Sequence, residues 1–168
     1  MIAIFQRPRD WYRWTAFFLL PAAAAMLGIG TAVMKLLTMS HSGAVAARAE
    51  SLQAAREATV AMLTYKADSV ESDLNYARSR LTGAFLDKYT TLIKTQVIPA
   101  AKEKQISAAA QVPAMASVSA NPSHAVALVF VDQTIAPAGQ TPTTTATSVR
   151  VSLDKVDGKW LVSGFDPV

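Results

Sequence analysis

The stretch VRVSLDKVDGKWLVSGF, residues 149–165, decides the fold class of this 168-residue chain. Its first six residues alternate apolar and polar side chains, which is the pattern of a strand with one buried face. Asp157-Gly158 is a dipeptide favoured in two-residue type I′ turns, where both central residues need a positive φ angle. The apolar residues that follow can return as a second strand. The stretch therefore predicts an antiparallel β-hairpin.

Two strand candidates precede this hairpin. HAVALVFVD, residues 124–132, is apolar on both faces, one with residues 126, 128 and 130 and the other with residues 125, 127, 129 and 131. ISAAAQVPAMASVSA, residues 106–120, is a weaker candidate, because Pro113 cannot donate a hydrogen bond to a neighbouring strand. Asn121-Pro122 predicts a turn between them, and the Pro/Thr/Gly-rich stretch 136–148 predicts a loop whose last residues can already be extended. The chain thus predicts an antiparallel meander.

A cluster of acids opens the helical part of the chain, in YKADSVESDLNYARSRLTG, residues 65–83. Asp68 and Glu71 have the spacing of a helix-capping box, and apolar residues 70, 74, 77 and 81 follow on one helical face. Gly83 suits a left-handed helix end. A calcium loop would need a different spacing and a glycine, and a catalytic pair would need an apolar cleft. We therefore interpret the acids as the start of a helix.

Two more helices are expected around this one. An apolar stripe from Phe85 to Val97 predicts a helix that ends at Pro99. The Ala- and Arg-rich segment 38–64 has apolar residues at helical spacing and predicts a juxtamembrane helix. Helices followed by a separate run of strands indicate an α+β domain over residues 65–168, with the helices on one face of the sheet.

The segment Thr15–Met34 carries no charged residue and is long enough to cross a bilayer as a helix, which we place at 15–37. A cleaved signal peptide is the alternative, but the apolar run is too long and lacks a nearby small-x-small cleavage site. Arg7, Arg9 and Arg13 precede the span, whereas Lys35 alone follows it closely. Positive residues favour the cytoplasmic side, so we expect a cytoplasmic tail over 1–14 and a periplasmic domain beyond the span of the inner membrane.

Signals for chemistry are weak. The chain has no cysteine and two histidines, His41 and His124, which cannot supply the three or four converging ligands of a zinc site. It has no glycine-rich phosphate loop, no H-E-x-x-H and no G-x-S-x-G. Half of the net charge of +4 lies before the span, and the outer domain has no basic stripe for nucleic acid. We expect no catalytic residue, no metal and no cofactor.

Two features point to contacts with other proteins. Ala24, Gly28 and Ala32 lie four residues apart in the predicted span, a spacing that lets another helix approach closely. The second feature is the doubly apolar strand, since a sheet covered by helices on one side needs only one apolar face. The other face is either a set of small residues in contact with water or a docking surface for another subunit. We expect an exposed docking surface around Val129, Val131 and Trp160.

The run LTYKADSVESDLNYARSRLTGAFLDKY, residues 63–89, resembles the Mce-associated membrane proteins of actinobacteria. Members show a similar pattern, and the matching positions here are Leu63, Tyr65, Leu74, Ala77, Leu81, Thr82, Gly83, Phe85 and Tyr89. The closing GKWLVSGFDPV is similar to the last strand of that family. The resemblance covers the span and the outer domain. It implies a cystatin-like, nuclear-transport-factor-two-like domain, a fold also found in an inner-membrane component of type IV secretion systems.

The resemblance further implies a non-enzymatic accessory subunit of a mammalian-cell-entry (Mce) lipid importer, with the permease and Mce proteins as partners and the membrane lipid around it. Two alternatives stay open. The fold often encloses a pocket, so the domain could bind a lipid or act as an enzyme, and His124 and Tyr89 would then be the candidate polar groups. The chain could also be an inner-membrane scaffold of a secretion system.

Overall fold

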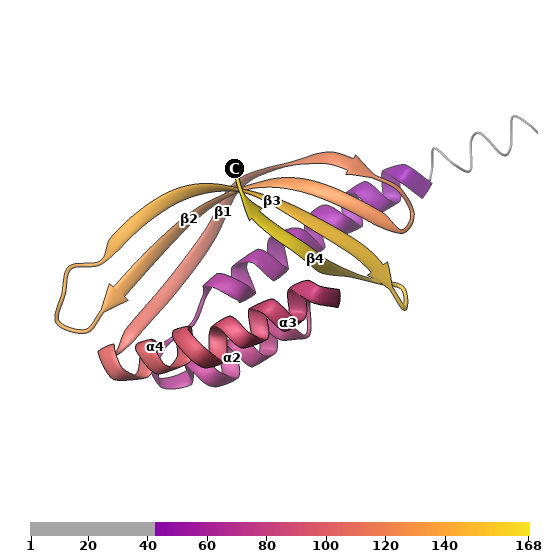
Figure 1. Ribbon diagram of the computed structural model, residues 1–168. Helices are drawn as coiled ribbons and strands as arrows, with labels where there is room; N and C mark the ends of the chain where they lie inside the picture. Colours follow the sequence, from indigo (N-terminus) through magenta and orange to yellow (C-terminus); the bar gives the residue numbers. More distant parts are fainter. Residues whose placement is uncertain (1–42) are drawn as a thin grey trace, which may run out of the picture. The chain divides into compact units, whose positions relative to one another are not determined.

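Four antiparallel strands form a single sheet in the order β1-β2-β3-β4 (Figure 1). They are β1 (Ile106–Ala120), β2 (His124–Pro137), β3 (Thr143–Val156) and β4 (Lys159–Pro167). Each strand pairs with the next one along the chain, which confirms the predicted meander. This computed structural model describes residues 43–168. The predictions for the tail 1–14, the span 15–37 and its contact residues lie outside the described residues.

The β3–β4 hairpin has the predicted turn. Asp157 and Gly158 have φ angles of 49° and 78°, and Val156 pairs with Lys159 across the turn. The alternation in β3 also has the expected consequence, because Val149, Val151 and Leu153 are buried. The last residues of the loop predicted over 136–148 are extended as expected, since β3 begins at Thr143, and the loop also starts later because β2 extends to Pro137.

Strand β1 has the same bounds as the weak, interrupted candidate predicted over residues 106–120, but it runs as one strand through its proline. It spans 15 residues, and its register against β2 shifts between Gln111 and Ala114 and again between Ser117 and Ser119. Pro113 lies within the first irregularity. Because β1 is an edge strand, a proline there removes no hydrogen bond to a second neighbour. The proline therefore bends the strand pairing locally without ending the strand.

The helices differ from the prediction mainly at Pro99. Residues 43–63 form one long helix, and a short 3₁₀ turn (Ala67–Ser69) leads into α2 (Val70–Arg78). A second helical run consists of α3 (Gly83–Leu92), a π-helical turn (Ile93–Val97) and α4 (Ile98–Lys104). The prediction that this run ends at Pro99 is wrong. Pro99 lies in the first turn of α4, where the missing N–H is tolerated, directly after the change in hydrogen-bond pattern.

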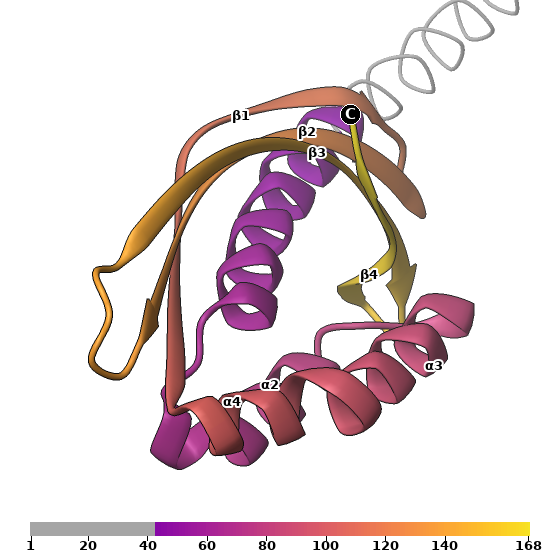
Figure 2. The same cartoon turned by 60° about the vertical axis from the view of Figure 1, so that its left-hand side comes forward.

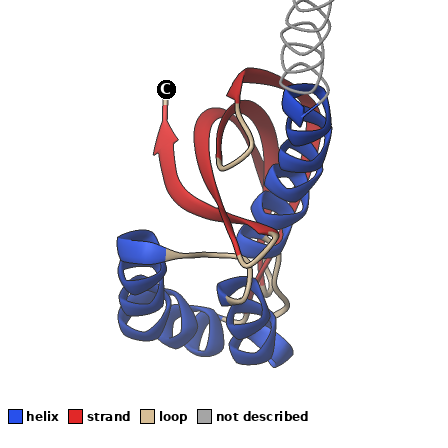
Figure 3. Cartoon of the chain, turned by 90° about the vertical axis from the view of Figure 1, so that its right-hand side faces the viewer, coloured by secondary structure: helices blue, strands red, loops and turns tan. Residues whose placement is uncertain are grey.

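The sheet is strongly curved and has a covered inner face. Figure 2 shows β1, β2 and β3 arching over helix 43–63, with α2, α3 and α4 at the open side of the arch. Figure 3 separates the layer of strands from helix 43–63, which runs alongside it, and from the other helices below. Residues 43–168 form one compact unit, so helix 43–63 packs as part of the domain that we predicted over 65–168.

The core lies between the concave face of the sheet and the helices. Its largest fully buried side chains come from every layer: Leu74 and Val70 on α2, Ile93 on the π turn, Val129, Val151, Leu153 and Val162 on the strands. This arrangement confirms the predicted α+β class, with helices packed on one face of an antiparallel sheet. In the part of the chain that the structure describes, no helix is both long and apolar enough to cross a membrane.

Candidate interaction sites

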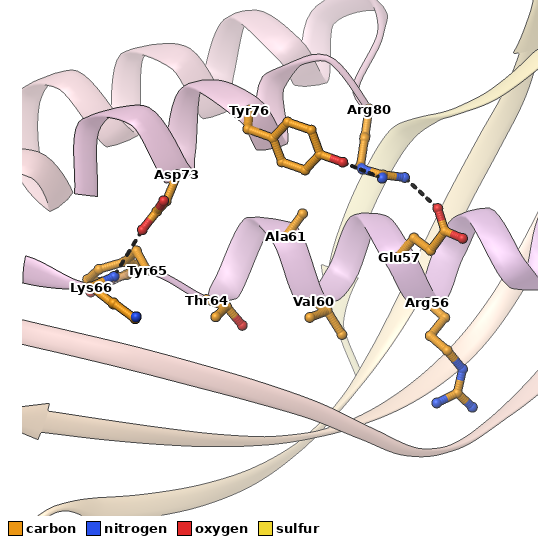
Figure 4. A pocket seen from close by; sticks show the side chains of 10 residues that line it. All are labelled: Arg56, Glu57, Val60, Ala61, Thr64, Tyr65, Lys66, Asp73, Tyr76 and Arg80. Carbon is orange, nitrogen blue, oxygen red and sulfur yellow. Dashed lines mark hydrogen bonds and ion pairs between the residues drawn. The ribbon is translucent and has the colours of Figure 1, made fainter. Parts of the chain in front are cut away.

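An open groove lies between helix 43–63 and α2 (Figure 4). It has a volume of about 650 Å³, and its lining combines Val60 and Ala61 of helix 43–63 with several charged side chains. Arg80 crosses the groove: its Nη1 donates to Glu57 Oε2 at 2.7 Å and its Nη2 donates to the Tyr76 hydroxyl at 2.8 Å. Its guanidinium also lies 5.3 Å from the centre of the Tyr76 ring.

These contacts shift the pKa values of both charged partners toward the ionised forms. Hydrogen bonds from Gln53 and from Arg80 lower the pKa of Glu57, and the hydrogen bond to the Tyr76 hydroxyl raises the pKa of Arg80 above its already high value. Both groups therefore stay ionised at neutral pH. A carboxylate and a guanidinium held in fixed contact are suited to binding and to fixing structure, and poorly suited to proton transfer.

The acid cluster that the sequence placed at a helix start does lie there, but the capping box is wrong. Asp68 lies in the 3₁₀ turn, and neither possible start of the helix has a side-chain cap. Asp73 reaches back instead, accepting from the Lys66 N–H at 3.1 Å and the Ser69 hydroxyl at 2.7 Å. Glu71 points away and binds Lys102 on α4 at 2.7 Å. The 3₁₀ turn shifts the helix start, so the Asp68–Glu71 spacing no longer brackets it.

A second cavity of about 540 Å³ lies between α3, β4 and the end of helix 43–63. Its walls are largely apolar, and Phe85 and Phe165 stack there with ring centres 6.3 Å apart. Tyr89 lines the cavity, but its hydroxyl already donates to the Met62 carbonyl at 3.2 Å. Burial, with a smaller contribution from Tyr65, raises the pKa of Tyr89, so it stays protonated over the physiological range.

The structure does not bring His124 to that cavity. His124 begins β2 and is exposed, with its Nδ1 2.6 Å from Asp154 Oδ1 on β3. The two residues are direct partners in the strand register. The hydrogen bond with His124, aided by Ser163, lowers the pKa of Asp154. His124 and Tyr89, the two polar candidates from the sequence, therefore form no common site. In residues 43–168 no three His, Asp or Glu side chains gather as they would around a metal ion.

The docking face predicted around Val129, Val131 and Trp160 is wrong about exposure. These three side chains are 0%, 3% and 9% exposed and belong to the core. Trp160 Nε1 donates to Glu50 on helix 43–63 at 3.1 Å, and Lys155 lies 5.4 Å from the Trp160 ring centre. Because helix 43–63 fills the concave side of the sheet, it covers the face to which these residues point.

The apolar face left open is the opposite one. Val126 and Leu128 are partly exposed, and Phe130 is 41% exposed. Their partners across the strands are small or polar: Phe130 pairs with Ala114 and Ser148, and Leu128 with Ala116 and Arg150. We call Val126, Leu128 and Phe130 the convex patch. The doubly apolar strand was the correct signal for it, but sequence periodicity could not tell which face the helices would cover.

The groove has no counterpart among the sequence predictions. Glu57 and Arg80 are 23 residues apart, so no local pattern pairs them. The only local signal was the spacing of Tyr76 and Arg80, four residues apart, at which helical side chains are neighbours.

No family model matches the chain. It is 50% identical over 159 residues to the Mycobacterium tuberculosis protein named Outer membrane protein Rv1973, covering 95% of this chain and 99% of that protein. It is also 44% identical over 124 residues to Uncharacterized protein Rv1362c of the same species, covering 73% of this chain and 56% of the relative.

Solved structures resemble the chain at much lower identity. An IcmL-like type IV secretion system protein from Legionella pneumophila has a TM-score of 0.62 and 13% identity, covering 72% of this chain and 91% of that one. The periplasmic domain of DotI has a TM-score of 0.59 and 19% identity, covering 70% of this chain and 91% of that one. VirB8 of Agrobacterium tumefaciens has a TM-score of 0.58 and 14% identity, covering 71% of this chain and 90% of that one. These likenesses show the expected nuclear-transport-factor-two-like fold. By its near full-length identity to a curated mycobacterial relative, the chain belongs to the family of Outer membrane protein Rv1973.

Proposed function

We propose that this chain is a non-catalytic, membrane-anchored accessory subunit that binds a larger transport complex of the cell envelope and stabilises or regulates it. The observation that carries the proposal is the convex patch. A domain whose helices already cover the concave face does not need a second apolar face for its own core. Exposed apolar residues around an aromatic side chain are typical of the centre of a protein–protein interface.

The envelope is the expected setting for three reasons. A curated relative at 50% identity is named an outer membrane protein. The fold is shared with periplasmic domains of secretion systems. The charge-free segment Thr15–Met34 has the length and flanks of a membrane span with a cytoplasmic N-terminus, followed by a periplasmic domain. We place the protein in the inner membrane on the basis of that span.

The particular complex that we propose is an Mce-type lipid importer. The support is the resemblance of residues 63–89 and of the closing strand to Mce-associated membrane proteins. In this proposal Ala24, Gly28 and Ala32 contact a helix of the permease or of an Mce protein, and the convex patch contacts the periplasmic part of the assembly.

The test is a tagged purification of the full chain from native membranes in mild detergent, followed by mass spectrometry. We expect Mce proteins and their permease to be recovered with the wild type. Phe130→Ser should reduce that recovery, whereas Val156→Ser should not, because Val156 is similarly exposed (39%) but lies at the hairpin outside the patch. Gly28→Leu with Ala32→Leu tests the membrane contact in the same way. Recovery of the wild type without any such partner would contradict the proposal.

A second candidate function follows from the 540 Å³ cavity beside α3. Its apolar walls and the stacked Phe85 and Phe165 would suit the acyl chain of a lipid, with exposed Lys88 at the lining. Mass spectrometry of lipid extracted from the same purified protein separates the two functions. Lipid retained in stoichiometric amount, and lost in Phe85→Ala, would favour the ligand-binding function. Secretion ATPases among the recovered proteins would instead favour a secretion scaffold.

A further inference from the structure

The chain covers parts of the exposed edges of its own sheet. Residues 143–147 of β3 extend past the end of β4 and stay uncovered by the rest of residues 43–168, but they expose no large apolar side chain. At β4, the Thr82 N–H donates to the Val162 carbonyl and the Val162 N–H donates to the Arg80 carbonyl, both at 2.9 Å. Beyond Val162, α3 packs against the strand. An edge strand presents a row of free N–H and C=O groups that can pair with another chain, and covering it is a common protection.

The first half of β1 is covered in a similar way. Tyr65 and Ala108 exchange two backbone hydrogen bonds at 2.9 and 2.8 Å. The Ala110 N–H donates to the Thr64 hydroxyl at 3.0 Å, and Arg56 donates to the Val112 carbonyl at 2.7 Å. One backbone bridge at Tyr65 and two side chains, those of Thr64 and Arg56, therefore occupy the outer edge of residues 108–112.

This cover stops at Pro113. Among the described residues, nothing donates to or accepts from the outer edge of the segment 114–120, which we call the free edge. Its sequence, AMASVSA, has no charged residue, so it lacks the charges that protect many edge strands, and the irregularity between Ser117 and Ser119 is the one such protection within it. Val118, at the second register irregularity, is 63% exposed. The free edge is thus a strand with open hydrogen-bonding groups, an exposed apolar residue and no charge to keep another strand away.

We propose that the free edge pairs with the same segment of a second copy of this chain, in antiparallel orientation, so that two four-stranded sheets join into one. A two-fold axis makes such an interface self-complementary, because each residue meets the same segment of its partner. The segment suits self-pairing for two reasons. It places no like charges opposite each other, and its alanine and serine side chains allow two strands to approach without a clash. Pro113 bounds the free edge at one end, so the paired segment is about seven residues long.

Full-length protein in detergent provides the first test. We expect a dimer by light scattering after size exclusion, corrected for bound detergent. Val118→Lys should raise the dissociation constant of the dimer by about tenfold or more, since the two-fold axis brings two added charges together. Val156→Lys is the matched control: it makes the same substitution at another exposed valine (39%), at the β3–β4 hairpin and outside the free edge, and should leave the dimer intact.

Cross-linking provides the second test, and the absence of native cysteine removes any background. Single cysteines at Ala114, Ala116 and Val118 should form homodimeric cross-links with a short thiol-reactive reagent, most efficiently at the position nearest the two-fold axis. Lys94→Cys, at an exposed position on the π turn, should form none. A monomer in detergent, a dimer that Val118→Lys leaves unchanged, or equal cross-linking at Lys94→Cys would each overturn the proposal. The last two results would place the contact elsewhere, for example in the membrane span.

Discussion

Arg80 connects parts of the chain that are far apart in sequence. Its guanidinium binds Glu57 on helix 43–63 and the Tyr76 hydroxyl on α2, while its backbone carbonyl accepts from Val162 on β4. The side chains of the ion pair are 29% and 44% exposed, so water screens the attraction between them. Pairs of this kind contribute only about 0.2–1 kcal/mol to stability. The Nε of Arg80 is buried and has no acceptor among the described residues, which reduces the net contribution further.

We expect Arg80→Met to lower the free energy of unfolding by about 1 kcal/mol, because it removes the ion pair but keeps the packing of the side-chain stem. A double-mutant cycle with Glu57→Gln, followed by urea unfolding, should give a coupling energy of about 0.5 kcal/mol. Lys88→Met is the control, since Lys88 is exposed and has no ion pair within residues 43–168. A coupling energy of zero would mean that the Glu57–Arg80 contact contributes nothing in solution.

Strand β2 is the element whose two faces the structure separates. Val129 points into the core and is completely buried, whereas Val126, three residues earlier, lies on the convex side and is partly exposed. The same truncation at both positions therefore measures which face is covered. We expect Val129→Ala to cost about 2 kcal/mol and Val126→Ala to cost less than about 1 kcal/mol, because only the first leaves a cavity in packed surroundings. Thermal or urea unfolding of the two variants decides this. Equal losses of stability would mean that both faces of β2 are buried.

The stability of the whole domain should depend on pH through its surface ion pairs. Hydrogen bonds from Lys155, from Gln53 and from Lys102 lower the pKa values of Glu50, Glu57 and Glu71 respectively, and His124 lowers that of Asp154. A carboxyl group whose pKa is lower in the folded state stabilises the fold above its unfolded-state pKa. It loses that contribution as the pH falls through the folded-state value.

We therefore expect the free energy of unfolding to be nearly constant from pH 7 to about pH 5 and to fall below that. Urea unfolding at a series of pH values measures the slope. High salt should reduce the loss of stability below pH 5, because it screens exposed ion pairs. Glu57→Gln should remove part of that loss. A stability that rises on acidification would contradict this assignment of the charged groups.

The sequence by itself determined the parts of this protein that depend on neighbouring residues. The Asp157-Gly158 turn, the alternation in β3 and the helix after residue 68 each follow from local backbone preferences and from the period of the apolar pattern. The α+β class followed from the order of these elements. The resemblance of residues 63–89 to a known family led to the expected fold, which the solved structures confirm.

The tertiary structure decided everything that depends on distant partners. Whether Pro113 ends a strand depends on β1 being at an edge of the sheet, and whether Pro99 ends a helix depends on the π turn before it. Which face of β2 is exposed depends on where helix 43–63 packs, because a strand that is apolar on both sides carries no preference of its own. The groove at Arg80 and the free edge of β1 arise only when residues separated by tens of positions lie side by side. No local pattern encodes that proximity.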